Sequence, residues 1–370
     1  PIVSGVAALM LEANPGLGYR DIQEILAVSA RHNDPGSAGW QFTGAQNWNG
    51  GGMHFSHDYG FGAVDALAAV RLAEVWDIAN PTAHTYSNLL TESYSGSAIS
   101  LSDLGQGTDS ITVESSQALT VEHVRVNLDM RNDVNDFEVR LIGPDGTVSL
   151  LIDNPATSGD VEFMTTSTAY RGLSSAGTWT LDVRDTVSGN SIDLAGWDLT
   201  FYGRQAGNDD HYVFTNEFGS LSSLDAGRAT LDDMDGGTDT LNLAGMTNAS
   251  TIHLDPGDGA SNIGGTSVNI AQADIFENVI GGDGDDYFVG NALDNELYGM
   301  RGDDTLIGGG GSDTVFYSLD IESFMFNFLS QSVLEITDTT GLLGTDRIEE
   351  TEYFNFNDSL FSLDQLLERE

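Results

Sequence analysis

The sequence predicts a multidomain, mainly β protein in which a helical segment is followed by a β-sandwich and then by a parallel β-roll. Two observations support this prediction. Near residue 85 the spacing of apolar residues changes from the helical period of about 3.6 to the strand period of about 2. A nine-residue repeat rich in glycine and aspartate begins at Gly281. The 370 residues suffice for about two or three domains, and we expect the following regions: 1–80, 85–203, 205–317 and 318–370.

The first region, residues 1–80, is expected to be mainly helical. From Pro1 to Leu11 the chain has no charged residue, and apolar side chains surround the whole helical circumference. This pattern is typical of a helix that is buried on every side, and it lacks the cap of an exposed helix start. A bilayer span needs about 20 apolar residues, and a signal peptide needs a basic start. The run from Pro1 to Leu11 meets neither requirement. We therefore expect the chain to begin inside the core of a domain, with a first helix that ends at Asn14 and Pro15. A second, amphipathic helix has its apolar face at these residues: Ile22, Ile25 and Leu26.

The second region, residues 85–203, is predicted to form an antiparallel β-sandwich. Its apolar residues alternate with polar ones, as expected for strands with one buried face. Turn signals such as GPDG and SAG separate the runs. The alternating apolar positions are Val124, Val126, Leu128 and Met130; Phe137, Val139 and Leu141; Trp179, Leu181 and Val183; Trp197, Leu199 and Phe201.

The third region, residues 205–317, contains four consecutive nonapeptides, GGDGDDYFV, GNALDNELY, GMRGDDTLI and GGGGSDTVF. They follow the pattern G-G-x-G-x-D-x-U-x of a calcium-binding β-roll. The sixth position of each repeat is acidic or an amide, and its residues are Asp286, Asn295, Asp304 and Asp313. The eighth position is apolar, and its residues are Phe288, Leu297, Leu306 and Val315. Because two nonapeptides make one coil, residues 18 apart should stack, which places Asp286 over Asp304 and Asn295 over Asp313.

Stacked carboxylates repel one another unless a cation lies between them. Ca²⁺ suits such a stack because it takes about 6–8 oxygen ligands, and glycines would adopt positive φ and aim backbone carbonyl groups inward. The expected calcium-binding residues are Gly282, Asp283, Gly284, Asp286, Asn295, Gly302, Asp304, Gly311 and Asp313. The column with Asn295 carries less charge and should bind more weakly. The alternative, a flexible Gly/Asp-rich linker, does not explain the regular apolar position. For DGGTDTLNL, residues 235–243, both a ligand role and a structural role stay open.

The composition narrows the possible functions. The formal net charge of −44 arises from 57 acidic and 13 basic residues, and every basic residue is an arginine. The absence of lysine excludes P-loop and Schiff-base chemistry, and so acidic a chain disfavours binding to nucleic acid. The absence of cysteine excludes disulfides and thiolate sites. The excess of carboxylates suits hard cations, or an acidic surface in a saline habitat.

Several stretches resemble known families. PIVSGVAALMLEANPGLGYRDIQEIL is similar to the segment after the nucleophile motif G-T-S-x-A-x-P of subtilisin-like serine proteases, and HFSHDYGFGAVDALAAV resembles the end of the kexin-like catalytic domain. The helical region would then be the C-terminal remnant of an α/β subtilisin-like domain. VEHVRVNLDM, DFEVRLIGPDGT, FMTT, GTWTLDVRDT and LAGWDLTFYG resemble the proprotein-convertase P domain (P/homo B), which implies a jelly-roll sandwich that abuts the catalytic domain. NLAGMTNASTIHL, FENVIGGDGDD and TDRIEETEYFNFNDSLFSLDQLL are similar to the C-terminal β-roll of serralysin-type proteases and other RTX proteins.

This resemblance implies that the catalytic residues lie outside the chain. Pro1 would be the last residue of the nucleophile motif, so the serine would precede it, with the aspartate and histidine elements farther upstream. Neither H-E-x-x-H nor G-x-S-x-G occurs. His54, His57, Asp58 and Asp65 are expected to serve packing or loop bonding rather than catalysis. Structural roles are also expected for His123, Trp40, Trp48 and Trp76.

The function expected from these resemblances is that of the C-terminal portion of a secreted, calcium-dependent serine endopeptidase with a polypeptide substrate. Calcium is the cofactor, and neither a nucleic acid partner nor a membrane span is expected. Because RTX proteins typically leave bacteria through a one-step secretion apparatus, the resemblance implies an extracellular location, with residues 318–370 as a β-rich cap and secretion region. The alternative is a non-catalytic, calcium-binding adhesion or surface module.

Overall fold

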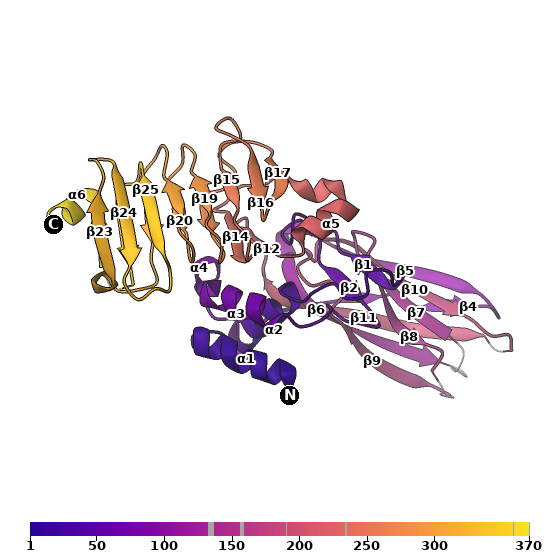
Figure 1. The fold of residues 1–370 in the computed structure, drawn as a ribbon. Helices are drawn as coiled ribbons and strands as arrows, with labels where there is room; N and C mark the ends of the chain where they lie inside the picture. Colours follow the sequence, from indigo (N-terminus) through magenta and orange to yellow (C-terminus); the bar gives the residue numbers. More distant parts are fainter. Residues whose placement is uncertain (132–136, 156–158, 190, 234, 358, 370) are drawn as a thin grey trace.

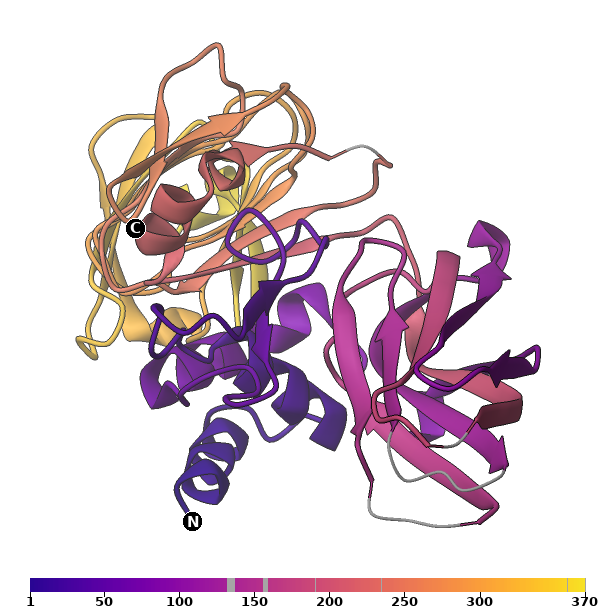
Figure 2. The same cartoon turned by 90° about the vertical axis from the view of Figure 1, so that its right-hand side faces the viewer.

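The computed structural model describes residues 1–131, 137–155, 159–189, 191–233, 235–357 and 359–369. Figure 1 shows three mainly separate parts, namely short helices near the N-terminus, a sandwich of long strands, and a stack of short strands that ends near the C-terminus. In the perpendicular view of Figure 2, the helices lie next to both the sandwich and the stack. Asp136 and Asp358 belong to two of the stretches that resemble known families, and they lie outside the described residues.

The N-terminal part consists of four helices, a small two-stranded sheet and a short 3-10 helix. Their bounds are α1 (Ile2–Ala13), α2 (Tyr19–Val28), β1 (Trp40–Phe42), β2 (His54–Ser56), α3 (Ala66–Glu74), α4 (Trp76–Ala79) and η1 (Tyr86–Asn88). The end of α1 before Asn14 is as predicted, and α2 buries Ile25. α3 begins at Ala66 because the Asp65 side chain accepts hydrogen bonds from two amides of its first turn.

The expectation that the first helix is buried on every side is wrong for this chain. Only Val6 and Met10 of α1 are buried, whereas Ile2 is 74% exposed and Leu9 is 49% exposed. The reason is that α1 packs against α3 along one face only. Its other apolar side chains remain in contact with solvent.

The central part is an antiparallel sandwich of two sheets, with strand orders β5-β10-β7-β8 and β3-β11-β6-β9, and β4 pairs with β11. The bounds are β3 (Leu90–Gly96), β4 (Ile99–Leu101), β5 (Gln106–Val113), the 3-10 helix η2 (Ser115–Gln117), β6 (Leu119–Arg131), β7 (Phe137–Ile142), β8 (Val148–Asp153), β9 (Val161–Ser167), β10 (Gly177–Asp185) and β11 (Ile192–Gln205). Every apolar position predicted to alternate is buried in one core between the sheets. The strand period that the sequence predicts is therefore confirmed.

The C-terminal part is a roll of two sheets whose central strands are parallel. The sheet orders are β12-β14-β18-β20-β22-β26-β27 and β13-β17-β16-β15-β19-β21-β25-β24-β23. The bounds are β12 (His211–Thr215), α5 (Phe218–Leu224), η3 (Ala226–Ala229), β13 (Thr230–Leu231), β14 (Thr240–Gly245), β15 (Thr251–His253), β16 (Ser261–Ile263), β17 (Thr266–Ile270), β18 (Asn278–Ile280), β19 (Tyr287–Val289), β20 (Glu296–Tyr298), β21 (Thr305–Ile307), β22 (Thr314–Phe316), η4 (Ile321–Ser323), β23 (Phe324–Phe328), β24 (Val333–Asp338), β25 (Thr345–Glu349), β26 (Tyr353–Phe356), β27 (Ser359–Ser362) and α6 (Leu363–Leu367).

One apolar core fills the roll from Tyr212 to Leu366. The four side chains at the eighth repeat position, Phe288, Leu297, Leu306 and Val315, are completely buried in it. The strands after residue 318 continue the same two sheets.

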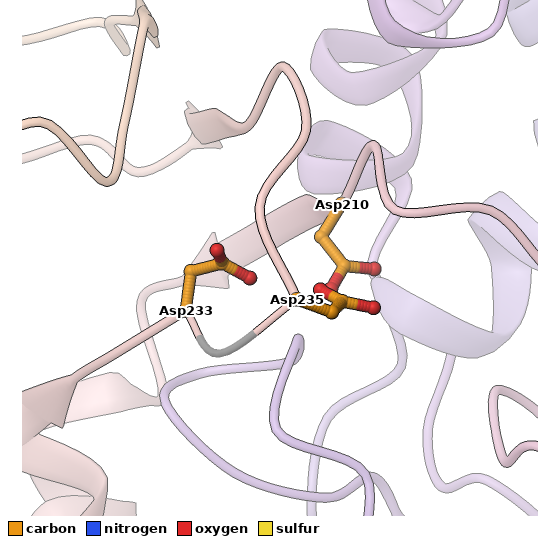
Figure 3. A group of neighbouring side chains, drawn as sticks. All are labelled: Asp210, Asp233 and Asp235. Atoms are coloured by element: carbon orange, nitrogen blue, oxygen red, sulfur yellow. The ribbon is translucent and has the colours of Figure 1, made fainter.

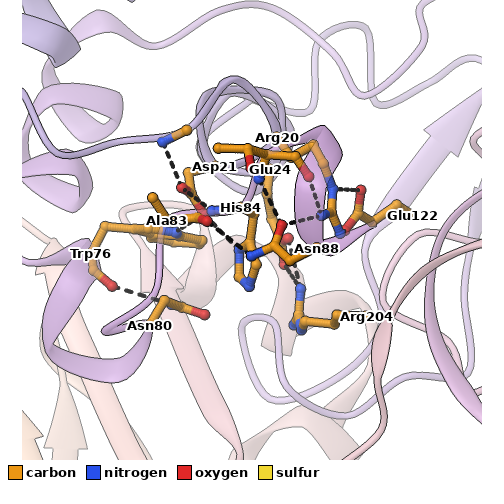
Figure 4. A network of polar contacts seen from close by, with 12 residues as sticks. Arg20, Asp21, Glu24, Trp76, Asn80, Ala83, His84, Asn88, Glu122 and Arg204 are labelled. Atoms are coloured by element: carbon orange, nitrogen blue, oxygen red, sulfur yellow. Dashed lines mark hydrogen bonds and ion pairs between the residues drawn. The ribbon is translucent and has the colours of Figure 1, made fainter. Parts of the chain in front are cut away.

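The helical part connects the sandwich to the roll. Ala69 and Leu72 of α3 share a buried cluster with Ala244 and Ile280 of the roll. On the other side, Arg20 of α2 forms a buried ion pair with Glu122 of β6, and the network around this pair is drawn in Figure 4.

We predict that Arg20→Met destabilises the protein because it leaves the Glu122 carboxylate buried without its cation. Loss of one partner of a buried pair costs about 3–5 kcal/mol, measured as the free energy of unfolding in urea. Arg31→Met is the matched control, since the Arg31 side chain is 60% exposed in its ion pair with Asp65 and should cost less than about 1 kcal/mol. Equal losses in the two variants would contradict the structural role of the buried pair.

Candidate metal centre

The side chains at the sixth repeat position stack along the roll. β19 pairs with β21 in the register Tyr287 to Thr305, so residues 18 apart are neighbours, as the sequence predicts. The amide of Asp286 donates to Asp304 Oδ1 at 2.8 Å. On the other side of the roll, the amide of Asn295 donates to Asp313 Oδ1 at 2.9 Å. Each sixth-position side chain thus bonds the backbone of the neighbouring coil.

These contacts continue beyond the four nonapeptides. The amide of Asp304 donates to Asp346 Oδ1 at 3.1 Å, and the amide of Asp313 donates to Glu352 Oε2 at 2.9 Å. We define the first ladder as Asp286, Asp304 and Asp346, and the second ladder as Asn295, Asp313 and Glu352.

The nine-residue spacing does not reveal Asp346 and Glu352 as ladder residues, because the hairpin of β23 and β24 interrupts it. A weaker signal was available. Each acidic residue stands two positions before a buried apolar residue, Ile348 or Phe354, as in the repeat itself. A search for acid-x-apolar segments that follow the repeat would have found both.

Both ladders contain buried carboxylates that form no ion pair among the described residues. Asp304 is 1% exposed and Asp313 is completely buried, and the Oδ2 atom of each has no hydrogen-bond partner among the described residues. Burial raises the pKa of Asp286 and of Asp313 to about 6. Burial and the neighbouring Asp346 also raise the pKa of Asp304. Since an unpaired buried carboxylate is costly, these oxygens are suited to hold a metal ion.

The glycines of the turns have two different roles. Gly302 and Gly311 adopt φ angles of +117° and +114°, which confirms the predicted positive φ. Gly282 and Gly284 lie outside that region of φ, so the prediction is wrong for them. They are needed for close approach instead, since a Cβ would lie 2.5 Å from a carbonyl oxygen at Gly282 and 2.4 Å from a backbone nitrogen at Gly284.

Asp283, which we expected among the calcium-binding residues, has another partner. Its Oδ1 lies 2.7 Å from Arg71 Nε of α3. Arg301 Nη1 lies 2.8 Å from Glu74 Oε2 and 3.9 Å from Asp283 Oδ1. These four side chains attach a turn of the roll to α3, a contact that the spacing of the repeat does not reveal.

A further acidic group lies at the start of the roll. The amide of Asp239 donates to Glu277 Oε2 at 2.7 Å, and the amide of Asp210 donates to Asp239 Oδ1 at 2.6 Å. Oxygen atoms of Asp210, Asp233 and Asp235 lie within 4.8 Å of one another (Figure 3). Burial, followed by the charges of the other two aspartates, raises the pKa of Asp210 to about 6. The degenerate copy at 235–243 thus contributes to an acidic group.

The residues that resembled a catalytic cluster serve separate contacts. His54 Nε2 lies 3.3 Å from Glu217 Oε2, and His57 Nε2 accepts from a backbone amide of β8 at 3.0 Å. The amide of Asp58 donates to a hydroxyl two residues earlier, and Asp65 caps α3. No serine nucleophile with a base and an acid is assembled from these residues.

The other candidates also have structural contacts. His123 stacks on Tyr202 with ring centroids 4.5 Å apart. Trp48 and Trp76 are buried, and their indole N–H groups donate to a backbone carbonyl and to a buried carboxylate. The Trp40 N–H donates to a loop carbonyl.

Two family matches cover most of the sandwich and the roll. Residues 121–201 match the proprotein convertase P-domain, and residues 200–366 match the peptidase M10 serralysin C terminal. In the described part of the chain, no helix has the length and hydrophobicity that a membrane span requires.

Curated relatives include three proteases. Protease KEX1 of Kluyveromyces lactis is 32% identical over 212 residues, which are 55% of this chain and 27% of that protein. Kexin of Saccharomyces cerevisiae is 30% identical, with 59% of this chain and 27% of that protein covered. The Aeromonas extracellular serine protease of Aeromonas sobria is 30% identical, with 51% and 35% covered. The chain therefore spans about a quarter to a third of the length of these relatives. The chain is therefore similar to the C-terminal part of kexin-like subtilisin-family serine proteases, and its family matches are a P domain followed by a serralysin-type C-terminal region.

Proposed function

We propose that the chain is the C-terminal portion of a secreted, calcium-dependent serine endopeptidase that cleaves polypeptides through an acyl-enzyme. In this proposal residues 1–80 complete a subtilisin-like catalytic domain, residues 85–203 are a jelly-roll P domain that supports it, and residues 205–317 with the cap 318–370 are an RTX β-roll. The names of the relatives, which are proteases, support the reaction class. The nucleophile, base and oxyanion hole would be supplied by residues outside this chain.

The observation that carries the calcium part of the proposal is the pair of ladders. The carboxylates of Asp286, Asp304, Asp313 and Asp346 are buried, and Asp304 and Asp313 each have an oxygen without a hydrogen bond among the described residues. Ca²⁺ prefers such oxygen ligands. We assign Asp286, Asp304 and Asp313 as charged ligands and Asn295 as a weaker, neutral one.

Backbone carbonyl groups of the glycine turns complete the proposed ligand set. They come from these residues: Gly282, Gly284, Gly302 and Gly311. Asp283 is not included because it pairs with Arg71. Calcium bound here would neutralise the ladders and hold successive coils together.

Calcium would also couple folding to export. A chain with a net charge of −44 repels itself in calcium-poor cytosol and would fold once it meets calcium outside the cell. A one-step secretion apparatus is the proposed route. The exposed apolar side chains of α1, which include Ile2 and Leu9, are the surface that the remainder of the catalytic domain would cover.

The protease assignment predicts that this chain alone does not react with a fluorophosphonate that labels active-site serines. The full-length product should react, and its serine should lie in a G-T-S-x-A-x motif directly before Pro1. Labelling of this chain alone would refute the assignment of catalysis to the missing part. Substitution of that serine in the full-length product would support an adhesion module instead.

The calcium assignment predicts that strand signal in far-ultraviolet circular dichroism increases when Ca²⁺ is added to the chelated chain. Asp304→Ala should raise the midpoint calcium concentration of this change about tenfold or more, and Asn295→Ala less, because the neutral amide supplies no charge. Asp258→Ala, at an exposed position, should leave the midpoint unchanged. Equal effects of Asp304→Ala and Asn295→Ala would contradict the difference between the ladders.

The raised pKa values predict opposite pH dependences with and without calcium. In chelator the folded state binds protons more tightly than the unfolded state at Asp286 and Asp313, whose pKa values are about 6. Stability should therefore fall as pH rises from about 4 to about 7, by up to about 1.4 kcal/mol per pH unit for each group. In saturating Ca²⁺, protons compete for the same oxygens, and stability should fall as pH decreases below about 6.

Calorimetric melting temperatures across this pH range measure both slopes. Asp21, whose pKa is lowered on balance by its hydrogen bonds with His84 against the effect of burial, contributes with the same sign in both conditions. The difference between the pH curves in calcium and in chelator therefore reports the contribution of the roll. Parallel curves in calcium and in chelator would contradict the assignment.

A further inference from the structure

A buried arginine at the junction of the three parts forms no ion pair within the described residues. Arg171 lies between β9 and β10 and is 5% exposed. Its Nε and Nη1 atoms are buried and have no hydrogen-bond partner among the described residues. No carboxylate of the described chain forms an ion pair with it. A guanidinium stays charged in proteins, so burial without a partner is costly.

Glu24 and Glu122, the carboxylates that act most strongly on Arg171, are already paired with other arginines (Figure 4). Arg204 Nη1 donates to Glu24 Oε1 at 3.1 Å and to Glu24 Oε2 at 2.8 Å. Arg20 Nε donates to Glu122 Oε2 at 2.9 Å. Three arginines therefore share two glutamates, and Arg171 is the cation left without a carboxylate.

The third acidic residue of this network, Asp21, is also occupied. Its Oδ2 accepts from the amides of Gly18 and His84 at 2.8 and 2.9 Å. Its Oδ1 accepts from the Trp76 indole at 3.1 Å and contacts His84 Nδ1 at 2.6 Å. Asp21 thus belongs to the contact between α2 and the segment after α4 (Figure 4), and it does not neutralise Arg171.

Arg171 lines a small cavity of about 30 Å³ where the helical part, the sandwich and β12 meet. Polar side chains of Glu24, Asn47, Asn80, Arg204 and His211 line it as well, together with apolar ones such as Val28, Trp48 and Met53. About 10–15 Å³ of such space already holds one water molecule, so the cavity has room for a water or a small ion.

We propose that this cavity binds a single halide ion, chloride under ordinary conditions, with the Arg171 guanidinium as its main partner. A water molecule would satisfy hydrogen bonds there but would add no negative charge beside the two arginines and one glutamate of the lining. A monatomic anion satisfies both, and the apolar part of the lining suits a weakly hydrated ion better than a polyatomic one. The ion would join residues from all three parts of the chain.

The site is independent of the calcium ladders, since none of its residues belongs to them. Its location indicates its role. Glu24 comes from α2, Arg171 and Arg204 come from the sandwich, and His211 begins β12 of the roll. Burial lowers the pKa of His211 to about 4, so this side chain is neutral at neutral pH and does not itself supply a second cation.

Two measurements on the full chain in calcium test the proposal. Crystals soaked in bromide should show one anomalous scattering peak beside Arg171. The melting temperature should rise by roughly 2–4 °C for each tenfold increase in chloride once the ion begins to saturate. The total ionic strength is held constant with methanesulfonate, a bulkier, polyatomic anion.

Arg171→Met should abolish the chloride dependence, and Arg131→Met is the matched control. Arg131 is 45% exposed and pairs with Asp129 on the sandwich surface, so its loss should leave the dependence intact. The absence of a bromide peak, or a melting temperature of the unmodified chain that does not respond to chloride, would show that the cavity holds only water and would overturn the proposal. The bromide result stands even if Arg171→Met fails to fold.

Discussion

The stacking of carboxylates along the roll is the constraint on which the rest of the structure depends. A parallel roll places equivalent residues above one another at every coil, so an acidic side chain that recurs in the repeat meets its own copies. The backbone amides of neighbouring coils satisfy one oxygen of Asp304 and of Asp313, but they do not neutralise the charge. The apolar positions two residues later hold the sheets together. The roll therefore combines a cohesive interior with carboxylates buried in both ladders, at Asp286, Asp304 and Asp346 and at Asp313, and the proposed calcium ions would neutralise them.

The arginines are distributed in a complementary way. Only 13 are present in this acidic chain, and several of them lie where the parts meet. Arg71 and Arg301 attach α3 to the turn that contains Asp283. Arg20 and Arg204 attach α2 to the sandwich. The scarce positive charge is thus used for contacts between parts, whereas the roll is left with uncompensated negative charge. Under the proposed calcium role, loss of the ion would therefore weaken the roll more than the sandwich.

Local patterns predicted the elements well, since strand period and repeat register depend on neighbours in the sequence. The alternation over 124–130 and the stacking of Asp286 on Asp304 are both found in the structure. What failed depends on tertiary context. The exposure of α1 is set by which elements cover it, and the partner of Asp283 lies on a helix more than two hundred residues earlier. The unpaired state of Arg171 could not be foreseen either, because it depends on how three arginines share two glutamates from different segments.

Amide hydrogen exchange of the ladder residues, with and without Ca²⁺, tests the central claim most directly. The amides of Asp286, Asn295, Asp304 and Asp313 each donate to a side chain of the next coil. The account predicts strong protection of these four amides in calcium and rapid exchange in chelator, while amides in the interior of β6 and β11 stay protected in both. Equal protection of the ladder amides in calcium and in chelator would contradict it.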